Sequence, residues 1–318
     1  MLESAFGTTE AAGRWRVMPT ARPCALVLLN PHAAGGRAAR LVAPLEQALV
    51  GTGARLVVTN SVAQARAELL AQPRGHRVVV AGGDGSLQQL LPSLLARQHE
   101  LALLPCGTGN DTARAFGVHR LPWPEALALG LRAPAQPIDV GEAEHDGRRT
   151  PFISSLCAGF DAAVAERALN GPQWLRGMPR YLWATVLEIA ALRSHALRVQ
   201  VDGVTVHDGP ALFASSLNTP SYGSGMPAAP KARIDDGRLQ LLLAGRFGRL
   251  GALAMMPLLS TGLHLWHPNV RCQPFREMDI SSATPLPLAA DGEVLPATAG
   301  LTVRVRAGAL QAVRQTAA

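Results

Sequence analysis

The sequence is poor in lysine, and this excludes two large classes of nucleotide-binding enzyme. Lys231 is the one lysine among 30 lysines and arginines, and it lies in the sequence Pro-Lys-Ala-Arg. A Walker A loop needs a lysine directly before serine or threonine, and a protein kinase needs a lysine on a strand that reaches the ATP phosphates. Lys231 fits neither pattern, so the chain is neither a Walker-type NTPase nor a protein kinase.

Cysteine and histidine are present but are not spaced as metal ligands. The 4 cysteines form no Cys-x-x-Cys pair, which argues against a zinc knuckle or a disulfide framework and is typical of a reducing cytosol. None of the 9 histidines pairs with another at metal-binding spacing, and no Gly-x-Ser-x-Gly elbow occurs. A zinc enzyme or a hydrolase is therefore not expected.

Long hydrophobic runs are also missing. No stretch of about 18 uninterrupted apolar residues occurs, so no segment is expected to span a bilayer. Residues 1–20 contain charged side chains and no apolar core of the kind that signal peptides have. We therefore expect a cytoplasmic protein that can bind peripherally to the inner face of the membrane.

The composition is that of a folded, basic protein. Hydrophobic residues make up 48% of the 318 residues, which is enough for a core, and the formal net charge is +7. A basic surface favours an anionic partner: nucleic acid, an anionic membrane face or a phosphate-rich small molecule. The arginines are scattered and no recognition motif occurs, so nucleic acid is not expected as a partner.

The first part of the chain alternates between strand and helix patterns, which predicts a mostly parallel sheet with helices on both faces. The first domain is expected over residues 21–138. Apolar runs indicate strands at 24–30, 56–59, 78–81 and 101–104, and helical spacing follows at 37–50, 62–71, 86–96 and 111–116.

The second part, residues 139–305, is dominated by short strand patterns, one of them over 150–156, and predicts an antiparallel β-sandwich. Two longer apolar stretches, 181–192 and 250–266, interrupt it. The last strand pattern, 301–305, can close either domain, and residues 306–318 are a candidate for completing the first domain.

One glycine-rich turn carries the first chemical signal. Gly82-Gly83-Asp84-Gly85-Ser86 directly follows a predicted buried strand and precedes a predicted helix. Glycines at such a turn let backbone N–H groups approach a phosphate closely. The carboxylate of Asp84 suits a bound Mg²⁺ or the deprotonation of a hydroxyl. The alternative is a plain helix N-cap, and this turn alone does not decide between them.

A second glycine-rich turn supports the functional interpretation. Pro105-Cys-Gly-Thr108-Gly-Asn-Asp111 follows the next predicted strand, and Asn30-Pro31 and Thr59 follow the first two strands. The carboxyl ends of parallel strands share one edge of the sheet, where open α/β sheets bind ligands. The turns together predict a nucleotide-phosphate cradle that uses no Walker lysine.

These motifs resemble those of the diacylglycerol kinase catalytic-domain family, which includes the sphingosine and ceramide kinases and the bacterial YegS-type lipid kinases. The resemblance begins at Asn30-Pro31 and runs through both glycine-rich turns. It continues through Ile138-Asp-Val-Gly, Gly159-Phe-Asp-Ala162 and residues 230–237, and it ends at Asp291-Gly-Glu293. It covers residues 24–305, nearly the whole chain.

The resemblance implies transfer of the γ-phosphate of ATP to a lipid hydroxyl, with Mg²⁺, in a cleft between the two domains. It implies that Asp84 is a catalytic carboxylate and that Glu293 or Asp291 accepts the proton of the hydroxyl. It also implies a structural Mg²⁺ held by the Asp236 carboxylate. The implied ATP-binding residues are Asn30, Pro31, Thr59, Gly83, Asp84, Gly85, Ser86, Leu87, Gln88, Gln89, Thr108 and Asp111, and the implied Mg²⁺ ligands beside Asp236 are the main-chain oxygens of Arg233 and Arg238.

Without the other motifs, two of these segments have simpler interpretations. Asp291-Gly-Glu293 is compatible with an ordinary hairpin turn, because Asp-Gly is a favoured turn pair. The segment 235–237 is compatible with an exposed turn. The chain also departs from the family pattern at Ala34, a position usually held by glycine, and at Gln88-Gln89, where relatives commonly have Asn-Glu. The last change removes a carboxylate near the phosphates.

Several alternatives stay open. An NAD kinase shares Gly-Gly-Asp-Gly and the two-domain plan, and a non-catalytic nucleotide or lipid sensor could keep the fold. Residues 173–183 mix aromatic side chains with arginines, as interfacial segments do, although a core helix has a similar composition. The sequence does not select among diacylglycerol, phosphatidylglycerol and sphingoid acceptors, and a homodimer is neither indicated nor excluded.

Overall fold

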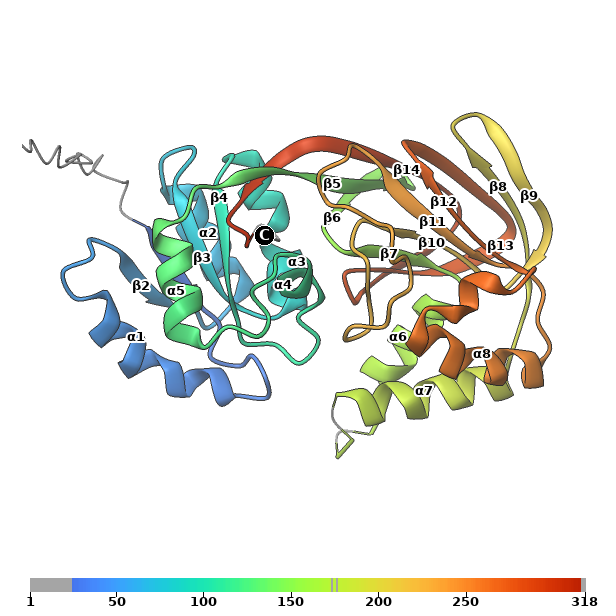
Figure 1. Cartoon of the computed structure of the whole chain (residues 1–318), viewed down its shortest axis with the longest axis horizontal. Helices are drawn as coiled ribbons and strands as arrows, with labels where there is room; N and C mark the ends of the chain where they lie inside the picture. The colour runs from blue at the N-terminus through green and yellow to red at the C-terminus, as the bar shows by residue number, and fades with distance from the viewer. Residues whose placement is uncertain (1–24, 173, 176, 316–318) are drawn as a thin grey trace, which may run out of the picture.

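The computed structural model describes residues 25–172, 174, 175 and 177–315. The expectation about residues 1–20, and part of that about residues 173–183, lie outside the described residues. Two domains lie side by side and are joined by two long strands (Figure 1). Among the described residues, no helix has the length and apolar character needed to cross a bilayer.

The first domain has the predicted parallel α/β architecture. Its strands are ordered β2-β1-β3-β4 and all pair in parallel. The strands are β1 (Leu26–Leu29), β2 (Arg55–Val58), β3 (Arg77–Gly82) and β4 (Glu100–Pro105). The helices are η1 (Arg37–Leu41), α1 (Val42–Leu49), α2 (Val62–Ala71), α3 (Asp84–Ala96), α4 (Asp111–Ala115) and α5 (Trp123–Arg132), of which α5 was not expected and α3 begins two residues earlier than expected.

The side chains of β1 alternate between the two faces of the sheet, and this explains why helices cover both faces. Leu26 and Leu28 pack into one apolar cluster with α2 and α3, whereas Val27 and Leu29 pack into another with α1. Successive side chains of a strand point to opposite faces, so a continuous apolar run needs a layer of helices on each side.

The second domain is built from antiparallel strands with helices on one side (Figure 1). The segment expected as one strand, 150–156, is two, and α6 was not expected. The strands are β5 (Gln136–His145), β6 (Arg148–Phe152), β7 (Ser155–Ala158), β8 (His195–Val201), β9 (Val204–Ala211), β10 (Phe213–Leu217), β11 (Leu239–Ala244), β12 (Val270–Phe275), β13 (Glu277–Ala290) and β14 (Glu293–Ala312). The helices are α6 (Phe160–Leu169), α7 (Met178–Ala190), α8 (Arg249–Thr261) and η2 (Leu263–Trp266).

Asp-Gly pairs set the register of three hairpins in this domain. Two-residue turns at 146–147, 202–203 and 291–292 connect β5 to β6, β8 to β9, and β13 to β14. Both residues of each turn have positive φ, as the favoured hairpin turns require. The turn at 291–292 therefore places Asp291 and Glu293 at the tip of one hairpin.

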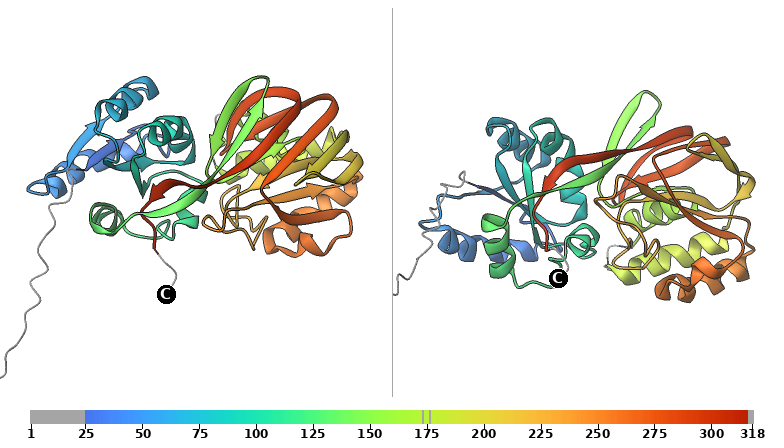
Figure 2. Two further views of the ribbon diagram at one scale, coloured as in Figure 1. Left: turned by 90° about the horizontal axis from the view of Figure 1, so that it is seen from above. Right: turned by 45° about the horizontal axis from the view of Figure 1, so that its top comes forward.

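Strand β14 ties the two domains together. It pairs with β13 and β5 in the second domain, and its last residues, Gln311 and Ala312, then pair in parallel with β4 of the first domain. Figure 2 shows β5 and β14 crossing side by side from one domain to the other. The expected fold class, a parallel α/β domain followed by an antiparallel β domain, is confirmed.

Candidate active site

The turns after β1, β2 and β3 meet at one edge of the parallel sheet. The side-chain amide of Asn30 donates a hydrogen bond to the Ser86 hydroxyl, with 2.8 Å between the two atoms. The Asn30 side-chain oxygen accepts from the backbone N–H of His32, at 3.0 Å. These side chains, with Thr59 and Gln89, line a cavity of about 190 Å³. The sequence-predicted Asn30, Thr59, Ser86 and Gln89 are thus brought together.

The two glycine-rich turns touch each other through their backbones. A Cβ placed on Gly107 would lie 2.6 Å from the Cα of Gly83 and 2.5 Å from the side-chain oxygen of Asn110. Real Cβ atoms do not approach other atoms so closely, so only glycine fits at this position. The contact holds the turn after β3 against the turn after β4, and with them the carboxylates of Asp84 and Asp111.

Asp84 caps a helix, but not its own. Its two carboxylate oxygens accept hydrogen bonds from the backbone N–H groups of Asp111, at 3.0 Å, and Thr112, at 3.1 Å. These groups belong to the first turn of α4, where backbone donors have no partner within the helix. The carboxylate therefore bridges the two glycine-rich turns, and its fixed place depends on α4.

Asp111 reaches across to the second domain. One carboxylate oxygen accepts from the backbone N–H of Ser224 at 2.8 Å, whereas the other, Oδ1, is buried and finds no hydrogen-bond partner within the described part of the chain. Burial and the nearby charge of Asp84 raise the pKa of Asp111, against the Ser224 hydrogen bond. The Nε atom of Arg114 lies 3.9 Å from Oδ1, too far for a hydrogen bond. A buried carboxylate oxygen without a hydrogen-bond donor is costly unless a cation or a ligand group pairs with it.

Asp291 anchors the hairpin tip to the strand beside it. Its carboxylate accepts three backbone N–H groups, from Ile153 at 2.8 Å, Ser154 at 2.7 Å and Ser155 at 2.9 Å. These bonds favour the ionised carboxylate, but burial outweighs them and raises the pKa of Asp291 to about 7. With both oxygens engaged by the backbone, this side chain is placed to position the hairpin.

Glu293, at the other end of the same turn, reaches the first domain. A Cβ on Gly85 would lie 2.6 Å from its Oε1 atom, so the carboxylate rests directly on the glycine-rich turn. Glu293 is half-buried, and its carboxylate accepts no hydrogen bond from the residues that the structure describes. Of the two carboxylates at this tip, it is the one left free to meet a ligand.

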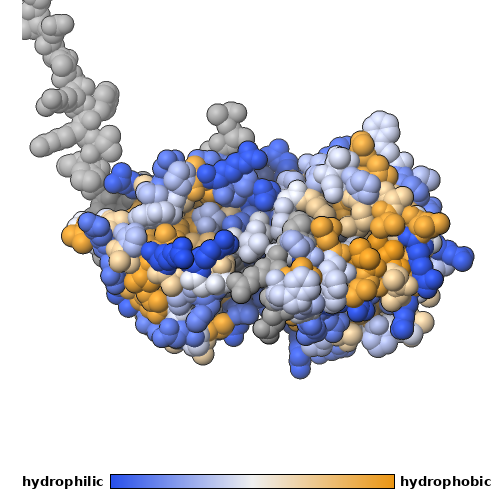
Figure 3. All heavy atoms as spheres, turned by 90° about the horizontal axis from the view of Figure 1, so that it is seen from below, coloured by the Kyte–Doolittle hydropathy of each residue, from blue (hydrophilic) through white to orange (hydrophobic). Residues whose placement is uncertain are grey.

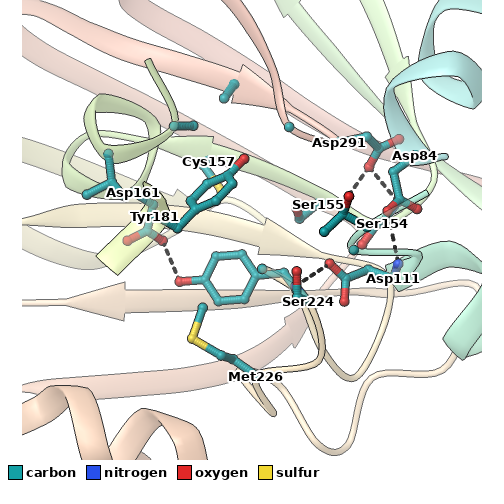
Figure 4. Close-up of a pocket in the computed structure, with 18 of the residues that line it drawn as sticks. Asp84, Asp111, Ser154, Ser155, Cys157, Asp161, Tyr181, Ser224, Met226 and Asp291 are labelled. Atoms are coloured by element: carbon teal, nitrogen blue, oxygen red, sulfur yellow. Dashed lines mark hydrogen bonds between the residues drawn. The ribbon is translucent and has the colours of Figure 1, made fainter. Parts of the chain in front are cut away.

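These groups line one end of a cavity of about 380 Å³ between the domains (Figure 4). The opposite end is formed mainly by apolar and aromatic side chains of α6, α7 and α8. The acidic end is lined by Gly83, Asp84, Gly85, Thr108, Asp111, Asp291 and Glu293, and the apolar end by Phe160, Val164, Tyr181, Leu182, Tyr222, Met256 and Leu259. A polar phosphate-sized end and a hydrophobic end thus share one cavity.

Some predicted site residues lie elsewhere. Leu87 packs in the core of the first domain, and the side-chain amide of Gln88 donates to the backbone oxygen of Pro151. Pro31 lines neither cavity described above. The side chains of Leu87 and Gln88 therefore serve packing and domain contact.

The predicted structural Mg²⁺ site remains a prediction. Asp236 is exposed, and one of its oxygens accepts from the backbone N–H of Arg238 at 3.0 Å. In the described residues, no group of three His, Cys, Asp or Glu side chains is arranged to hold a metal ion.

The residue that organises this region is Asp139, to which the sequence analysis gave no role. Its carboxylate accepts from the backbone N–H groups of Gly237, at 2.6 Å, and Gly308, at 2.8 Å. Asp235 in the same loop pairs with Arg314 at 2.6 Å, and this pairing lowers the pKa of Asp235.

The structure also adds residues that sequence reasoning left without a role. Asp161, Tyr181 and Ser224 face the cavity (Figure 4), and Tyr222 also lines it. Asp161 and Tyr222 are joined by a hydrogen bond although they lie 61 positions apart. Asp161 belongs to the Gly159-Phe-Asp-Ala162 motif, and Tyr181 lies in the segment 173–183 that mixes aromatic side chains with arginines. No short pattern marks Tyr222 or Ser224.

Comparison with known proteins agrees with this architecture. Residues 24–143 match the diacylglycerol kinase catalytic domain, and residues 154–314 match the YegS C-terminal NAD kinase beta sandwich-like domain. A "diacylglycerol kinase" of Mycobacterium tuberculosis is 32% identical over 189 residues, which are 59% of this chain and 61% of the relative, so the match spans about three fifths of that protein. A "probable lipid kinase YegS-like" of Pseudomonas savastanoi is 33% identical over 242 residues, 74% of this chain and 75% of the relative. The crystal structure of a diacylglycerol kinase from Bacillus anthracis superposes with a TM-score of 0.66 at 18% identity, covering 92% of this chain and 97% of the other.

Proposed function

The chain belongs to the family that combines the diacylglycerol kinase catalytic domain with the YegS-type C-terminal domain, and from this premise we propose that it is a lipid kinase that transfers the γ-phosphate of ATP to a lipid hydroxyl. The observation that carries the proposal is the single cavity with two unlike ends. Its acidic, glycine-rich end suits phosphate and metal, and its apolar end suits an acyl chain. An NAD kinase needs no such apolar end.

The nucleotide is placed by the turns of the first domain. Asn30, Thr59, Ser86 and Gln89 line the smaller cavity and would bind the nucleoside part of ATP. The phosphates would then lie over Gly83, where the absence of side chains exposes backbone N–H groups. This arrangement directs the γ-phosphate toward the larger cavity, where Glu293 rests on Gly85.

A Mg²⁺ ion fits the carboxylates of this end. Oδ1 of Asp111, which accepts no hydrogen bond from the described residues, and the neighbouring carboxylate of Asp84 would offer oxygen ligands. Mg²⁺ at kinase sites is held by one or two carboxylates together with substrate phosphates. The ion supplies neutralisation of the charge that develops on the transferred phosphoryl group. Asp84 and Asp111 keep their places through the cap on α4 and the contact with Ser224.

Glu293 is the best-placed general base. Its carboxylate is free of hydrogen bonds from the described residues, rests on Gly85 and lines the acidic end of the cavity. A base there accepts the proton of the attacking hydroxyl as the phosphoryl group is transferred. Asp291 acts through it: its three backbone hydrogen bonds hold the hairpin tip that carries Glu293.

The acceptor reaches the cavity from an exposed apolar face. We define the docking face as the exposed apolar side chains of α7, α8 and η2, and Figure 3 shows hydrophobic residues gathered on this side of the second domain. Leu182 both lines the cavity and is 49% exposed, so the face is continuous with the apolar end. The docking face consists of Leu182, Val186, Leu187, Leu250, Leu253, Leu263 and Trp266.

Charge around this face favours an anionic lipid surface as its occupant. Arg193 follows α7, and Arg246 and Arg249 stand at the start of α8, all three of them exposed. Apolar side chains inserted at a headgroup boundary with flanking arginines are typical of peripheral membrane binding. We therefore place the protein at a membrane surface during catalysis.

A pair of variants tests the transfer step. Glu293→Gln removes the base but no described hydrogen bond, so we expect transfer to a micellar lipid to fall by about 10²–10⁴-fold with little change in thermal stability. Glu46→Gln, on an exposed residue of α1, is the control. Equal turnover in the Glu293→Gln variant and the wild type, measured as ADP released with lipid present, would contradict the role of Glu293.

A further inference from the structure

Asp161 places a carboxyl group in the apolar end of the cavity, where the proposed phosphoryl transfer does not use it. It stands in the first turn of α6, directly after the end of β7. One of its oxygens, Oδ2, accepts hydrogen bonds from the hydroxyls of Tyr222, at 3.0 Å, and Ser215, at 3.2 Å. Both donors belong to the region around β10, so the carboxylate is held in one orientation.

The second oxygen of Asp161 has no such partner. No described residue donates a hydrogen bond to Oδ1, and the side chain keeps part of its surface accessible as it lines the cavity. The surroundings are apolar, and burial raises the pKa of Asp161 to about 6, so the group is mainly ionised at neutral pH. A carboxylate oxygen in such a place is costly unless a donor pairs with it.

The position of Asp161 separates it from the reacting groups. Figure 4 shows Asp161 at one end of the cavity beside the ring of Tyr181, and the carboxylates of Asp84, Asp111 and Asp291 at the other end. A hydroxyl bound beside Glu293 for phosphorylation is therefore not the group that meets Asp161. Any partner of Oδ1 must be a different part of the acceptor.

We propose that Asp161 is a specificity-determining residue that accepts a hydrogen bond from a second polar group of the acceptor, in addition to the hydroxyl that is phosphorylated. The inference rests on the proposed lipid kinase function. The second group is a donor, either a hydroxyl or an N–H, next to the acyl chain. The acceptor class is thus a lipid with two hydrogen-bond donors, such as a monoacylglycerol or an N-acyl amino alcohol, rather than a lipid whose single hydroxyl is the reacting one.

The discrimination between acceptors with and without a second donor follows from Oδ1 of Asp161, which accepts no hydrogen bond from the described residues. A site that pairs with a substrate hydroxyl or N–H rejects an analogue that lacks it, because the carboxylate oxygen beside the bound acyl chain then receives no hydrogen bond from the lipid. We expect a preference of about tenfold or more in kcat/KM for the acceptor that carries the second donor.

Matched acceptors test the proposal. The first pair is 1-octanoylglycerol and the octanoyl ester of propane-1,3-diol, which lacks only the secondary hydroxyl. The second pair is N-hexanoylethanolamine and the hexanoyl monoester of ethylene glycol, which lacks only the N–H. The wild-type protein should prefer the first member of at least one pair by about tenfold, and this comparison needs no variant to fold. Equal kcat/KM within both pairs would overturn the proposal while leaving the lipid kinase function intact.

Variants then assign the preference to this carboxylate. Asp161→Ala and the near-isosteric Asp161→Asn should each reduce the ratio of kcat/KM between the two-donor and the one-donor acceptor. Asp161→Ala should bring this ratio close to one, because it lowers kcat/KM for the two-donor acceptor selectively. Asp208→Asn, on an exposed aspartate of β9, is the control. An undiminished ratio in folded Asp161→Ala would contradict the proposal.

Failure of the proposed function is distinguishable from failure of this inference. If no lipid accepts phosphate, titration calorimetry of the same octanoyl pair measures the subsite without turnover. Tighter binding of 1-octanoylglycerol by wild type than by Asp161→Ala would still support the role of Asp161. The N-hexanoylethanolamine pair is titrated in the same way, and equal binding within both pairs would contradict the role of Asp161.

Discussion

Replacing Gly107 by alanine should disturb both glycine-rich turns at once. The added Cβ would lie 2.6 Å from the Cα of Gly83 and 2.5 Å from the Asn110 side-chain oxygen. Ordinary carbon contacts begin at about 3.5 Å, so the two backbones must separate by about 1 Å. Overpacking of this kind costs about 1–3 kcal/mol of the free energy of unfolding.

The effect on transfer should be larger than the effect on stability. The two turns carry Asp84 and Asp111, and a displacement of about 1 Å at a reacting site can cost about 10²-fold in rate. We therefore expect the Gly107→Ala variant to fold with a lowered melting temperature and to lose about 10²-fold of its lipid phosphorylation rate.

A matched glycine provides the control. A Cβ on Gly300, in β14, meets nothing closer than the backbone oxygen of Ile280, at 3.8 Å. Gly300→Ala should leave both melting temperature and transfer rate near the wild-type values. Calorimetric melting and initial rates of phosphate transfer measure the two effects. If Gly107→Ala matched Gly300→Ala in both, the close contact of the two turns would have no functional weight.

Two further predictions concern the docking face and the pH dependence of stability. Leu250 is 84% exposed on the docking face, and Leu250→Glu places a charge there. Binding to anionic vesicles, measured by sedimentation, should weaken by about tenfold or more, whereas turnover of a soluble short-chain acceptor should not change. Equal sedimentation of the variant and the wild type would contradict membrane binding through the docking face. Burial raises the pKa of Asp161 to about 6, so the folded protein holds this proton more tightly than the unfolded chain. The stability contributed by Asp161 is therefore complete below about pH 4 and is lost as the pH rises to about 6. Denaturant unfolding at several pH values measures the free energy of unfolding. Between about pH 4 and pH 6 this free energy should fall less in Asp161→Asn than in the wild type. Parallel changes of the free energy of unfolding with pH in the two proteins would contradict the prediction.

The edge of the parallel sheet could be predicted from the sequence because its signals are local. A buried apolar run followed by a glycine-rich turn indicates a strand, a turn and the position of both on the sheet. The side chains of Asn30 and Ser86 therefore meet as expected. Likewise, the Asp-Gly pair of Asp291 sets a hairpin, as the simpler interpretation of that segment indicated.

The partners of the acidic residues could not be predicted, because they come from distant segments. Asp84 was considered as a cap of its own helix, but it caps α4 because two turns pack together in three dimensions. Asp291 binds backbone groups 136 to 138 positions away. Asp161 meets Tyr222 only because α6 and the loop after β10 line the same cavity.

The most direct test of the central claim follows the γ-phosphate of ATP. The purified chain is incubated with Mg²⁺ and γ-labelled ATP, in one tube with bacterial lipid extract and in another with NAD, and label is counted in the organic and aqueous products. The account predicts label in a lipid of the organic phase, lost in Asp84→Asn and Glu293→Gln. Label on NAD with an unlabelled organic phase would contradict it.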